Sequence, residues 1–305
     1  MKALRAHQRG GPEQLVYEDA PRPIPGPGEV LVAVHAAAIT FAELTWPETW
    51  ESDGEDRTPI IPSHEVAGVV EEVGPGVAGL AVGDSVFGLV PFNRDGAAAE
   101  FVVLPADCLA RKRPEVSDVV AAAAALPALT AWEALRDQAR LAAGQSILIR
   151  GGTGAVGAFI TQFAHTIGAE VTVTVSSASS EPRAKTLGAD HVVTDLPDGQ
   201  FDFTIDAVGG DVPEWMYSAV RPGGTLLVLQ EPPSQELAAQ HGINAVFFVV
   251  GTRQDRLEEL ADLLAADGVE VAIAQTFPLS EGRAAYESGS LPKPGPGKTV
   301  ILVEN

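Results

Sequence analysis

The stretch from Ile147 to Ala164 places the strongest constraint on how this chain folds. An apolar segment of strand length ends in a cluster of glycines, and apolar residues then recur at helical spacing. Gly152, Gly154 and Gly157 fit the pattern G-x-G-x-x-G. In this pattern the first glycine forms a tight turn, the second lets backbone approach a pyrophosphate, and the third lets the helix pack on the strand. The stretch predicts a dinucleotide site at a helix N-terminus; the alternative is a flexible glycine loop.

The length and composition of the chain predict a soluble protein with more than one hydrophobic core. With 305 residues, 46% of them hydrophobic, the chain is long enough for two domains. No run of about 18 apolar residues is present, so we expect no membrane span. Lys2 and Arg5 are not followed by the apolar segment of a secretory signal, so we expect a cytoplasmic protein. Cys108 is the only cysteine, which excludes an internal disulfide and a multi-cysteine zinc site.

The net charge of −21 argues against one class of partner. A surface of that sign repels phosphate backbones, so we expect no binding to nucleic acid. The basic run at residues 111–113 is short and is followed by Pro114, and we interpret it as a solvated turn.

The first hundred residues have the character of a β domain. Short segments rich in β-branched residues alternate with glycine and proline, which is typical of an antiparallel barrel. An acidic loop is expected over residues 47–62. The expected strands lie at residues 1–7, 14–18, 29–35, 63–74 and 96–104, and residues 79–88 are expected to form a turn that leads into another strand.

The pattern changes at about Ser117. We expect one helix over residues 117–125 with Ser117 as its N-cap, and a second that begins at Pro127 and ends near Ala139. Strands and helices then alternate, which predicts a parallel sheet covered on both faces. The expected strands are 146–150, 170–175, 191–194, 201–207, 224–229 and 244–250, and the expected helices are 155–167, 182–187, 212–220 and 254–266.

The end of the chain returns to short strands, including residues 299–303, so we expect it to rejoin the N-terminal β domain. The predicted fold class is therefore α/β plus β. A substrate domain is expected over residues 1–120 and 270–305, with a nucleotide-binding domain of residues 121–269 inserted into it.

Eight motifs spread along the chain carry a family resemblance. They occupy residues 27–32, 64–70, 82–88, 128–132, 151–157, 187–190, 206–210 and 297–300. On these motifs the sequence resembles the medium-chain dehydrogenase/reductase superfamily, and in particular its zinc-independent quinone oxidoreductase and enoyl reductase branch. The resemblance implies a GroES-like β-barrel domain, an inserted Rossmann domain, and a nicotinamide cofactor in the cleft between them. It also implies a homodimer in which residues 246–250 pair with their copy.

The charge at the end of the second Rossmann strand bears on the choice of cofactor. NAD-preferring domains place an acid there to bind the ribose 2′-hydroxyl, whereas this chain has Ser176 and Ser177. The serines leave room for a 2′-phosphate, and Arg183 adds a charge-assisted contact, although Glu181 opposes it. We therefore expect NADPH; the alternative is that the serines only cap the next short helix. The expected cofactor contacts are Thr130, Gly152, Thr153, Gly154, Ala155, Val156, Gly157, Ser176, Ser177, Arg183, Val208, Phe248, Val249 and Val250.

The resemblance also bears on metal content. Zinc-dependent members of the superfamily use a cysteine at the position of Thr40 and the histidine of a His-Glu pair, here His64. One imidazole does not make a tetrahedral zinc site, and Cys108 is isolated in the sequence, so we expect no metal. Without a Lewis acid, hydride transfer favours an acceptor that is already electrophilic, such as a quinone or an α,β-unsaturated carbonyl.

The substrate end departs from the resemblance, because quinone reductases usually carry Asn-Pro-x-Asp where this chain has residues 40–43. Thr40 and His64 are the candidate catalytic residues. Alternatively Thr40 fills the volume of a cysteine, His64 is a supporting hydrogen-bonded residue, and water supplies the proton. Glu65 is expected in a structural salt bridge. The candidate substrate contacts are Phe41, Glu43, Trp46, Trp50 and Phe92. They suit a flat conjugated molecule. The alternative is that they only pack the loop on the barrel.

Together these features predict an NADPH-dependent reductase of a conjugated enone or quinone that uses no zinc. Two other classes stay open: a metal-free carbonyl reductase or alcohol dehydrogenase, and a non-catalytic NADPH-binding protein. The expected partners are a small-molecule substrate and a second copy of the chain, with no nucleic acid and no membrane.

Overall fold

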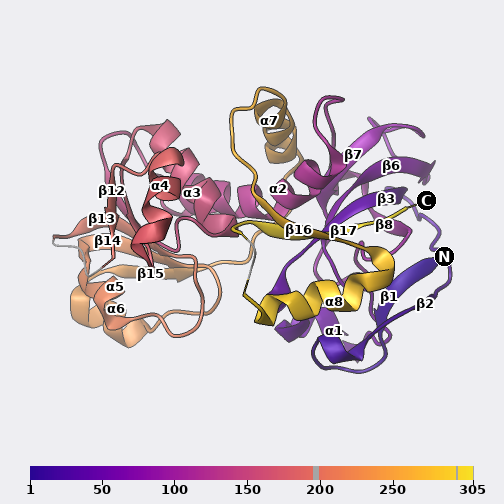
Figure 1. The fold of residues 1–305 in the computed structure, drawn as a ribbon, viewed down its shortest axis with the longest axis horizontal. Helices are drawn as coiled ribbons and strands as arrows, with labels where there is room; N and C mark the ends of the chain where they lie inside the picture. The colour runs from indigo at the N-terminus through magenta and orange to yellow at the C-terminus, as the bar shows by residue number, and fades with distance from the viewer. Residues whose placement is uncertain (195–198, 293–294, 305) are drawn as a thin grey trace. The chain divides into compact units, whose positions relative to one another are not determined.

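The structure, a computed structural model, describes residues 1–194, 199–292 and 295–304 (Figure 1). It divides into two compact units. Unit 1 comprises Met1–Leu126 together with Gly251–Asn305, and unit 2 comprises Pro127–Val250. The chain therefore leaves the first unit, forms the second, and returns to complete the first.

Unit 1 is built on a seven-stranded sheet with β3 (Glu29–Ile39) as its long central strand. The path through the sheet is β16-β17-β3-β6-β7-β9, and β8 also pairs with β3. All of these pairs are antiparallel except β16 with β17, which is parallel. The other strands are β6 (Glu65–Val73), β7 (Ser85–Leu89), β8 (Phe101–Pro105), β9 (Leu109–Arg111), β16 (Ile273–Pro278) and β17 (Lys298–Leu302).

Smaller elements surround this sheet. Two hairpins are present, and the expected acidic loop contains the second of them together with a short helix. The hairpin strands are β1 (Lys2–Ala6) with β2 (Leu15–Asp19), and β4 (Glu51–Ser52) with β5 (Glu55–Asp56). The helices of unit 1 are α1 (Pro47–Trp50), the first part of α2 (Asp118–Trp132), α7 (Gln254–Ala265) and α8 (Gly282–Glu287). Short 3₁₀ segments include η2 (Phe41–Thr45) and η3 (Ala106–Cys108).

The pairing of β17 with β3 brings the end of the chain back to its beginning. Thr299 lies opposite Ile39 and Val300 lies opposite Ala38. On the other side of β3, Ala38 lies opposite Glu65 of β6. The expected return of the C-terminal segment to the β domain is confirmed. The register also sets the first residue of β17, Lys298, beside the end of β3.

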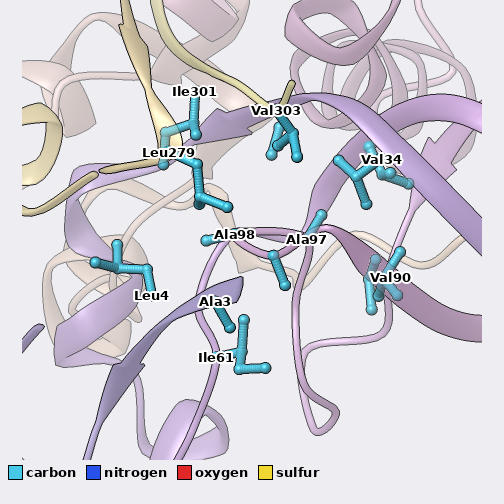
Figure 2. Close-up of a cluster of buried hydrophobic side chains, with 14 of the residues drawn as sticks. Ala3, Leu4, Val34, Ile61, Val90, Ala97, Ala98, Leu279, Ile301 and Val303 are labelled. Carbon is cyan, nitrogen blue, oxygen red and sulfur yellow. The ribbon is translucent and has the colours of Figure 1, made fainter. Parts of the chain in front are cut away.

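The core of unit 1 draws side chains from distant parts of the sequence. Figure 2 shows Leu4, Val34, Leu279 and Ile301 gathered around the buried Ala97–Ala98 segment, and all of them are buried. At about 25 cal/mol per Å² of apolar area removed from water, such a cluster is the main source of stability for this sheet.

Unit 2 is a six-stranded parallel sheet in the order β12-β11-β10-β13-β14-β15. Figure 1 shows α3 and α4 on one side of the sheet and α5 and α6 on the other, as expected for a doubly wound sheet. The strands are β10 (Ser146–Arg150), β11 (Glu170–Thr174), β12 (His191–Val193), β13 (Phe201–Asp206), β14 (Val220–Val228) and β15 (Asn244–Phe247). The helices are α3 (Ala155–Ile167), α4 (Glu181–Thr186), α5 (Glu214–Ser218) and α6 (Gln235–His241).

The expected break between two helices at Pro127 is wrong. Ser117 Oγ does accept the Val120 amide as an N-cap should, but the helix then runs without a break from Asp118 to Trp132, with Pro127 inside it. A π-helical segment, η4 (Glu133–Gln138), follows. The neighbours of the proline, including all of residues 121–126, are buried, so packing outweighs the lost hydrogen bond and the clash of the proline ring.

Helix α7 was expected in the nucleotide-binding domain, but it lies in unit 1. There Gln254 donates to the Leu109 carbonyl of β9, and Arg113 pairs with Asp262. Strand β15 ends at Phe247, so residues 248–250 lie outside the strand in which they were expected. The sequence also gave no indication of α6 or α8, both of which are only six or seven residues long.

Among the residues that the structure describes, one helical segment, Asp118–Gln138, has the length and apolar composition needed to cross a membrane. In its most apolar window 72% of the residues are buried inside the protein. A helix buried to this extent is typical of a protein core. The sequence of the chain has no uninterrupted apolar run of about 18 residues.

Replacing Ile301 by Ala should destabilise unit 1 strongly, because Ile301 is fully buried on the strand that joins the two ends of the chain. We expect a loss of about 2–5 kcal/mol for Ile301→Ala and about 0.5–1.5 kcal/mol for Ile301→Val, measured by urea unfolding. Leu291, which is 63% exposed, is the control, and its replacement by Ala should leave the stability nearly unchanged. Equal losses at the two positions would contradict this account of the core.

Candidate active site

The glycine loop of unit 2 connects β10 to α3. Its left-handed residue is Gly151, with φ of +81°, and the Gly154 amide donates to the Gly151 carbonyl at 3.0 Å to close the turn. Gly154 is the N-cap of α3, and no side chain caps that helix start. Gly152 lies at a central position of this turn, as the sequence predicted, while the positive φ falls on the preceding Gly151.

The three glycines of the motif differ in how much room the surrounding protein leaves for a Cβ atom. A Cβ on Gly157 would lie 2.1 Å from the Gly151 carbonyl oxygen, and one on Gly152 would lie 2.7 Å from Val173. These two glycines are therefore required by packing within the protein. At Gly154 the nearest atom would be 3.3 Å away, and the backbone there is extended, which any residue adopts. Packing within the protein therefore does not require a glycine at position 154.

Thr161 of α3 holds the loop against the helix, and sequence reasoning missed it. Its hydroxyl lies 3.0 Å from the Gly152 carbonyl and 2.9 Å from the Gly157 carbonyl, and the side chain is fully buried. Its position four residues after the last glycine was the available signal, since a threonine at i+4 can bond back to the helix backbone.

The residues after β11 take two roles. Ser177 accepts the Ser179 amide and caps the 3₁₀ segment η5 (Ala178–Ser180), which is the capping role left open by the sequence. Ser176 is exposed next to the strand end. Arg183 of α4 donates through Nε to the Thr153 carbonyl at 3.4 Å. Arg183 is thereby held against the glycine loop, and its contact with a 2′-phosphate stays a prediction.

The remaining cofactor candidates lie elsewhere in unit 2. Val208 follows β13, where the buried Asp206 accepts both Arg150 and the Val208 amide. Val208 and Val249 are exposed hydrophobic residues, with 53% and 61% of their surface accessible. Phe248 and Val250 are partly buried, and Thr130 lies buried in α2.

A buried ion pair in unit 1 reaches the Thr40 hydroxyl. Lys298 Nζ lies 2.7 Å from Glu65 Oε2 and 3.0 Å from Thr40 Oγ1, and Thr40 Oγ1 lies 3.2 Å from the same carboxylate oxygen. Glu65 and Lys298 are buried, whereas Thr40 is only partly buried. The expected salt bridge of Glu65 is present. Lys298 was not singled out from the sequence. The feature that could have identified it as a site residue is a lysine at the start of an apolar strand.

Glu43 lies in the interior and does not form a surface for substrate. Its carboxylate accepts the Tyr286 hydroxyl of α8 and the Ser63 amide at 3.0 Å. Burial raises the pKa of Glu43 to about 7, and the hydrogen bond from Tyr286 opposes that shift. Direct contact of this side chain with substrate, as the sequence suggested, is not supported because only 1% of the residue is exposed.

His64 is a buried, neutral imidazole. Burial lowers its pKa to about 3, helped by the charge of Arg57, while the carbonyls of Val90 and Pro91 act in the opposite direction. Its Nε2 lies 3.7 Å from Glu43 Oε2. Neither ring nitrogen has a partner within hydrogen-bond geometry among the described residues. A neutral imidazole is a hydrogen-bonding group rather than a strong acid at neutral pH.

The expected aromatic wall is smaller than predicted. Phe92 makes edge-on contacts with His64 and with Trp46, each at 5.2 Å between ring centroids, and Phe92 and Trp46 are partly buried. Phe41 is also partly buried and packs against Gly289. Trp50 is buried, and its indole donates to the Leu44 carbonyl, so it packs the loop instead of facing a ligand.

Replacing Glu43 by Gln should change how stability depends on pH. The folded protein binds the Glu43 proton up to about pH 7, whereas the unfolded chain releases it near pH 4.5. Glu43 therefore costs stability as pH rises through this window, by about 3 kcal/mol at most. We expect Glu43→Gln to be increasingly more stable than wild type from pH 4.5 to 7 in urea unfolding. The control Glu51→Gln, on an exposed side chain, should keep a constant offset; a constant offset for Glu43→Gln would disprove the assignment.

The middle and last glycines of the motif should respond differently to alanine. Gly157→Ala places a methyl group against the Gly151 carbonyl and forces α3 away from the loop, which we expect to cost about 1–3 kcal/mol. Gly154→Ala meets only that carbonyl at 3.3 Å, so its melting temperature should stay close to that of wild type. Thermal unfolding checks both variants, and equal effects would show that packing does not separate the two glycines.

Two family models match the chain. The first, described as an alcohol dehydrogenase GroES-like domain, matches residues 26–114, and the second, described as a zinc-binding dehydrogenase, matches residues 155–266. Among curated proteins, a mitochondrial NAD(P)H oxidoreductase of Mus musculus is 30% identical, over 91% of this chain and 82% of its own. A 2-haloacrylate reductase of a Burkholderia species is 27% identical, over 92% of this chain and 93% of its own.

Solved structures agree with these matches. A quinone oxidoreductase from Coxiella burnetii superposes with a TM-score of 0.89 at 27% identity, covering 100% of this chain and 99% of its own. A mycobacterial protein in complex with NADPH superposes with a TM-score of 0.86 at 27% identity, covering 99% of this chain and 100% of its own. Both coverages are nearly complete, so the likeness includes the GroES-like part and the Rossmann-like parallel sheet alike. The chain is an oxidoreductase that belongs to the medium-chain dehydrogenase/reductase superfamily.

Proposed function

We propose that this chain is an NADPH-dependent reductase that delivers a hydride to a conjugated enone or quinone without the help of zinc. The observation that carries the proposal is the pairing of Thr40 with Lys298 and Glu65 at the position where zinc-dependent members of the superfamily have a cysteine. Three further arguments concern the cofactor, the metal and the acceptor.

The cofactor argument rests on the glycine loop and its surroundings. Gly154 is left open by the protein's own packing, and α3 begins with backbone amides that no side chain caps, which suits a pyrophosphate. The exposed Ser176 follows β11 in place of an acid, and Arg183 is held at the loop. Glu181, exposed at the start of α4, is the nearby carboxylate that opposes a phosphate. The mycobacterial neighbour bound to NADPH supports the same choice.

The zinc that the second family model implies does not fit the residues present. The Thr40 hydroxyl is already hydrogen-bonded by the Lys298 ammonium, whose positive charge would repel a metal ion. Burial raises the pKa of Cys108 to about 11, so its thiol is protonated at neutral pH and unsuited to ligation. Within the described residues no group of three His, Cys, Asp or Glu side chains could hold a metal.

The acceptor argument follows from this lack of a Lewis acid. Bound NADPH would supply hydride chemistry, and the protein would supply position and hydrogen bonds. An enone or quinone accepts hydride with little further activation, because the negative charge moves onto a carbonyl oxygen. The partly buried rings of Trp46 and Phe92 suit a flat acceptor. A quinone oxidoreductase and a 2-haloacrylate reductase among the similar proteins support this class.

The test is a substrate panel followed through NADPH absorbance, with a quinone, an enone and an unactivated ketone, each with NADPH and with NADH. We expect turnover with the quinone or the enone, little with the ketone, and a dissociation constant for NADPH at least about tenfold below that for NADH. Ser176→Asp should reduce this preference, because it restores an acid near the 2′ position. Gly154→Ala should fold and yet bind NADPH poorly.

Each alternative has its own signature in this panel. Turnover with the ketone as fast as with the enone would favour a carbonyl reductase or alcohol dehydrogenase. Tight NADPH binding with no turnover on any acceptor would favour a non-catalytic binding protein. Equal affinity for NADH would disprove the cofactor preference, and stoichiometric zinc in the purified protein would disprove the metal-free assignment.

The homodimer stays a prediction. Strand β15 is the last strand in the order of its sheet, so its outer edge is the one that pairing with a second copy would use.

A further inference from the structure

Three strands of the unit 1 sheet bring their ends together at one point. β3 ends at Ile39, β6 begins at Glu65 and β17 begins at Lys298. The strand register sets Glu65 opposite Ala38, and Thr299 opposite Ile39. Thr40, Glu65 and Lys298 therefore meet as neighbours although they come from the beginning and the end of the chain. We call these three residues the ammonium triad.

The hydrogen bonds within the ammonium triad all converge on two oxygens. Lys298 Nζ donates to Glu65 Oε2 at 2.7 Å and to Thr40 Oγ1 at 3.0 Å. The Thr40 hydroxyl donates to Glu65 Oε2 at 3.2 Å. The other carboxylate oxygen, Glu65 Oε1, is buried and has no hydrogen-bond partner among the described residues. Glu65 can therefore accept a further hydrogen bond at Oε1. When the Thr40 hydroxyl turns away from Glu65, the Glu65 carboxylate stays paired with Lys298.

Stability alone does not explain this arrangement. Lys298 and Glu65 are only 8% and 1% exposed at their side chains, so both charges have lost most of their water. The attraction within such a buried pair often no more than offsets the desolvation of its two ions, and apolar residues of similar volume are commonly as stable. Thr40 is the partly exposed member of the ammonium triad, so it is the one that can reach a ligand.

We propose that Lys298 is the cationic positioning residue of the active site and acts through Thr40, whose hydroxyl donates a hydrogen bond to the acceptor oxygen on which negative charge develops. This inference rests on the proposed function. As hydride adds to the β-carbon of an enone, the C=C electrons shift to form an enolate, and NADPH is oxidised to NADP⁺. The Thr40 O–H turns from Glu65 to the enolate oxygen while Lys298 keeps donating to Thr40 Oγ1. A water molecule then gives a proton to the α-carbon and leaves as hydroxide, which completes the saturated carbonyl.

This assignment gives the Thr40 hydroxyl a charge-assisted character. A donor whose own oxygen accepts from an ammonium is polarised, and such bonds are stronger than those between neutral groups. The triad is also preorganised, because Lys298 and Glu65 are fixed by β17 and β6 and need not move during the reaction. Stabilising a developing oxyanion with a preorganised donor is worth about a hundredfold or more in rate.

The test is a mutant cycle on kcat for enone or quinone reduction at saturating NADPH. Thr40→Val removes the hydroxyl and keeps the ion pair. The paired variant Glu65→Gln with Lys298→Met removes both charges, so that no unpaired charge is left buried. We expect each to lower kcat by about 100-fold with KM changed much less, and the combined triple variant to be no slower than the worse of the two. Thr40→Ser should recover most of the rate, since it keeps the hydroxyl.

Two measurements separate a catalytic loss from a folding defect. NADPH affinity, measured by fluorescence, and the melting temperature should stay close to wild type in Thr40→Val. Lys2→Met is the matched control, since it removes a surface lysine of the same unit that pairs with Asp19, and its kcat should be unchanged.

The outcomes also distinguish this inference from the proposed function. A wild-type protein that reduces neither enone nor quinone overturns both. An active wild type in which the folded paired variant keeps its kcat, or in which the two losses multiply fully in the triple variant, overturns the role of Lys298 alone. A change in KM without a change in kcat assigns Thr40 to ground-state binding and overturns it as well.

Discussion

The pairing of β17 with β3 is the interaction on which the rest of unit 1 depends. It inserts the last strand of the chain beside the longest strand of the sheet, and with it Ile301 enters the core and Lys298 reaches Thr40. The same return of the chain delivers α8, whose Tyr286 hydroxyl satisfies the buried carboxyl group of Glu43. Both polar clusters near the proposed site thus join residues around 40–65 to residues near the C-terminus.

Local patterns predicted much of the fold. The glycine motif, the parallel sheet of unit 2 and most strand positions followed from hydrophobic periodicity and from glycine and proline, because those signals act over a few residues. The break expected at Pro127 failed because the buried surroundings of α2 outweigh the local cost of proline. Helix α7 packs within unit 1, which its amphipathic pattern could not indicate because that pattern does not reveal which sheet a helix covers.

The candidate site was predicted in outline and not in detail. Thr40, His64 and Glu65 were recognised from neighbouring motifs, but Lys298 and Tyr286 lie more than two hundred residues away from the groups that they contact. No periodicity encodes such a contact, which exists only once the strands are paired. The role expected of Trp50 failed for a related reason: its indole N–H found a backbone carbonyl inside the loop, which the sequence alone does not indicate.

The insertion of unit 2 has a consequence for how the protein folds during its synthesis. Unit 2 is continuous in sequence, so it can form its parallel sheet as soon as residue 250 has left the ribosome. Unit 1 must wait for β16 and β17, which come after unit 2 in the sequence, and until then β17 does not cover the edge of β3. The nucleotide half of the protein is therefore able to fold first. The ammonium triad can form only after β17, which follows unit 2 in the sequence, has paired with β3.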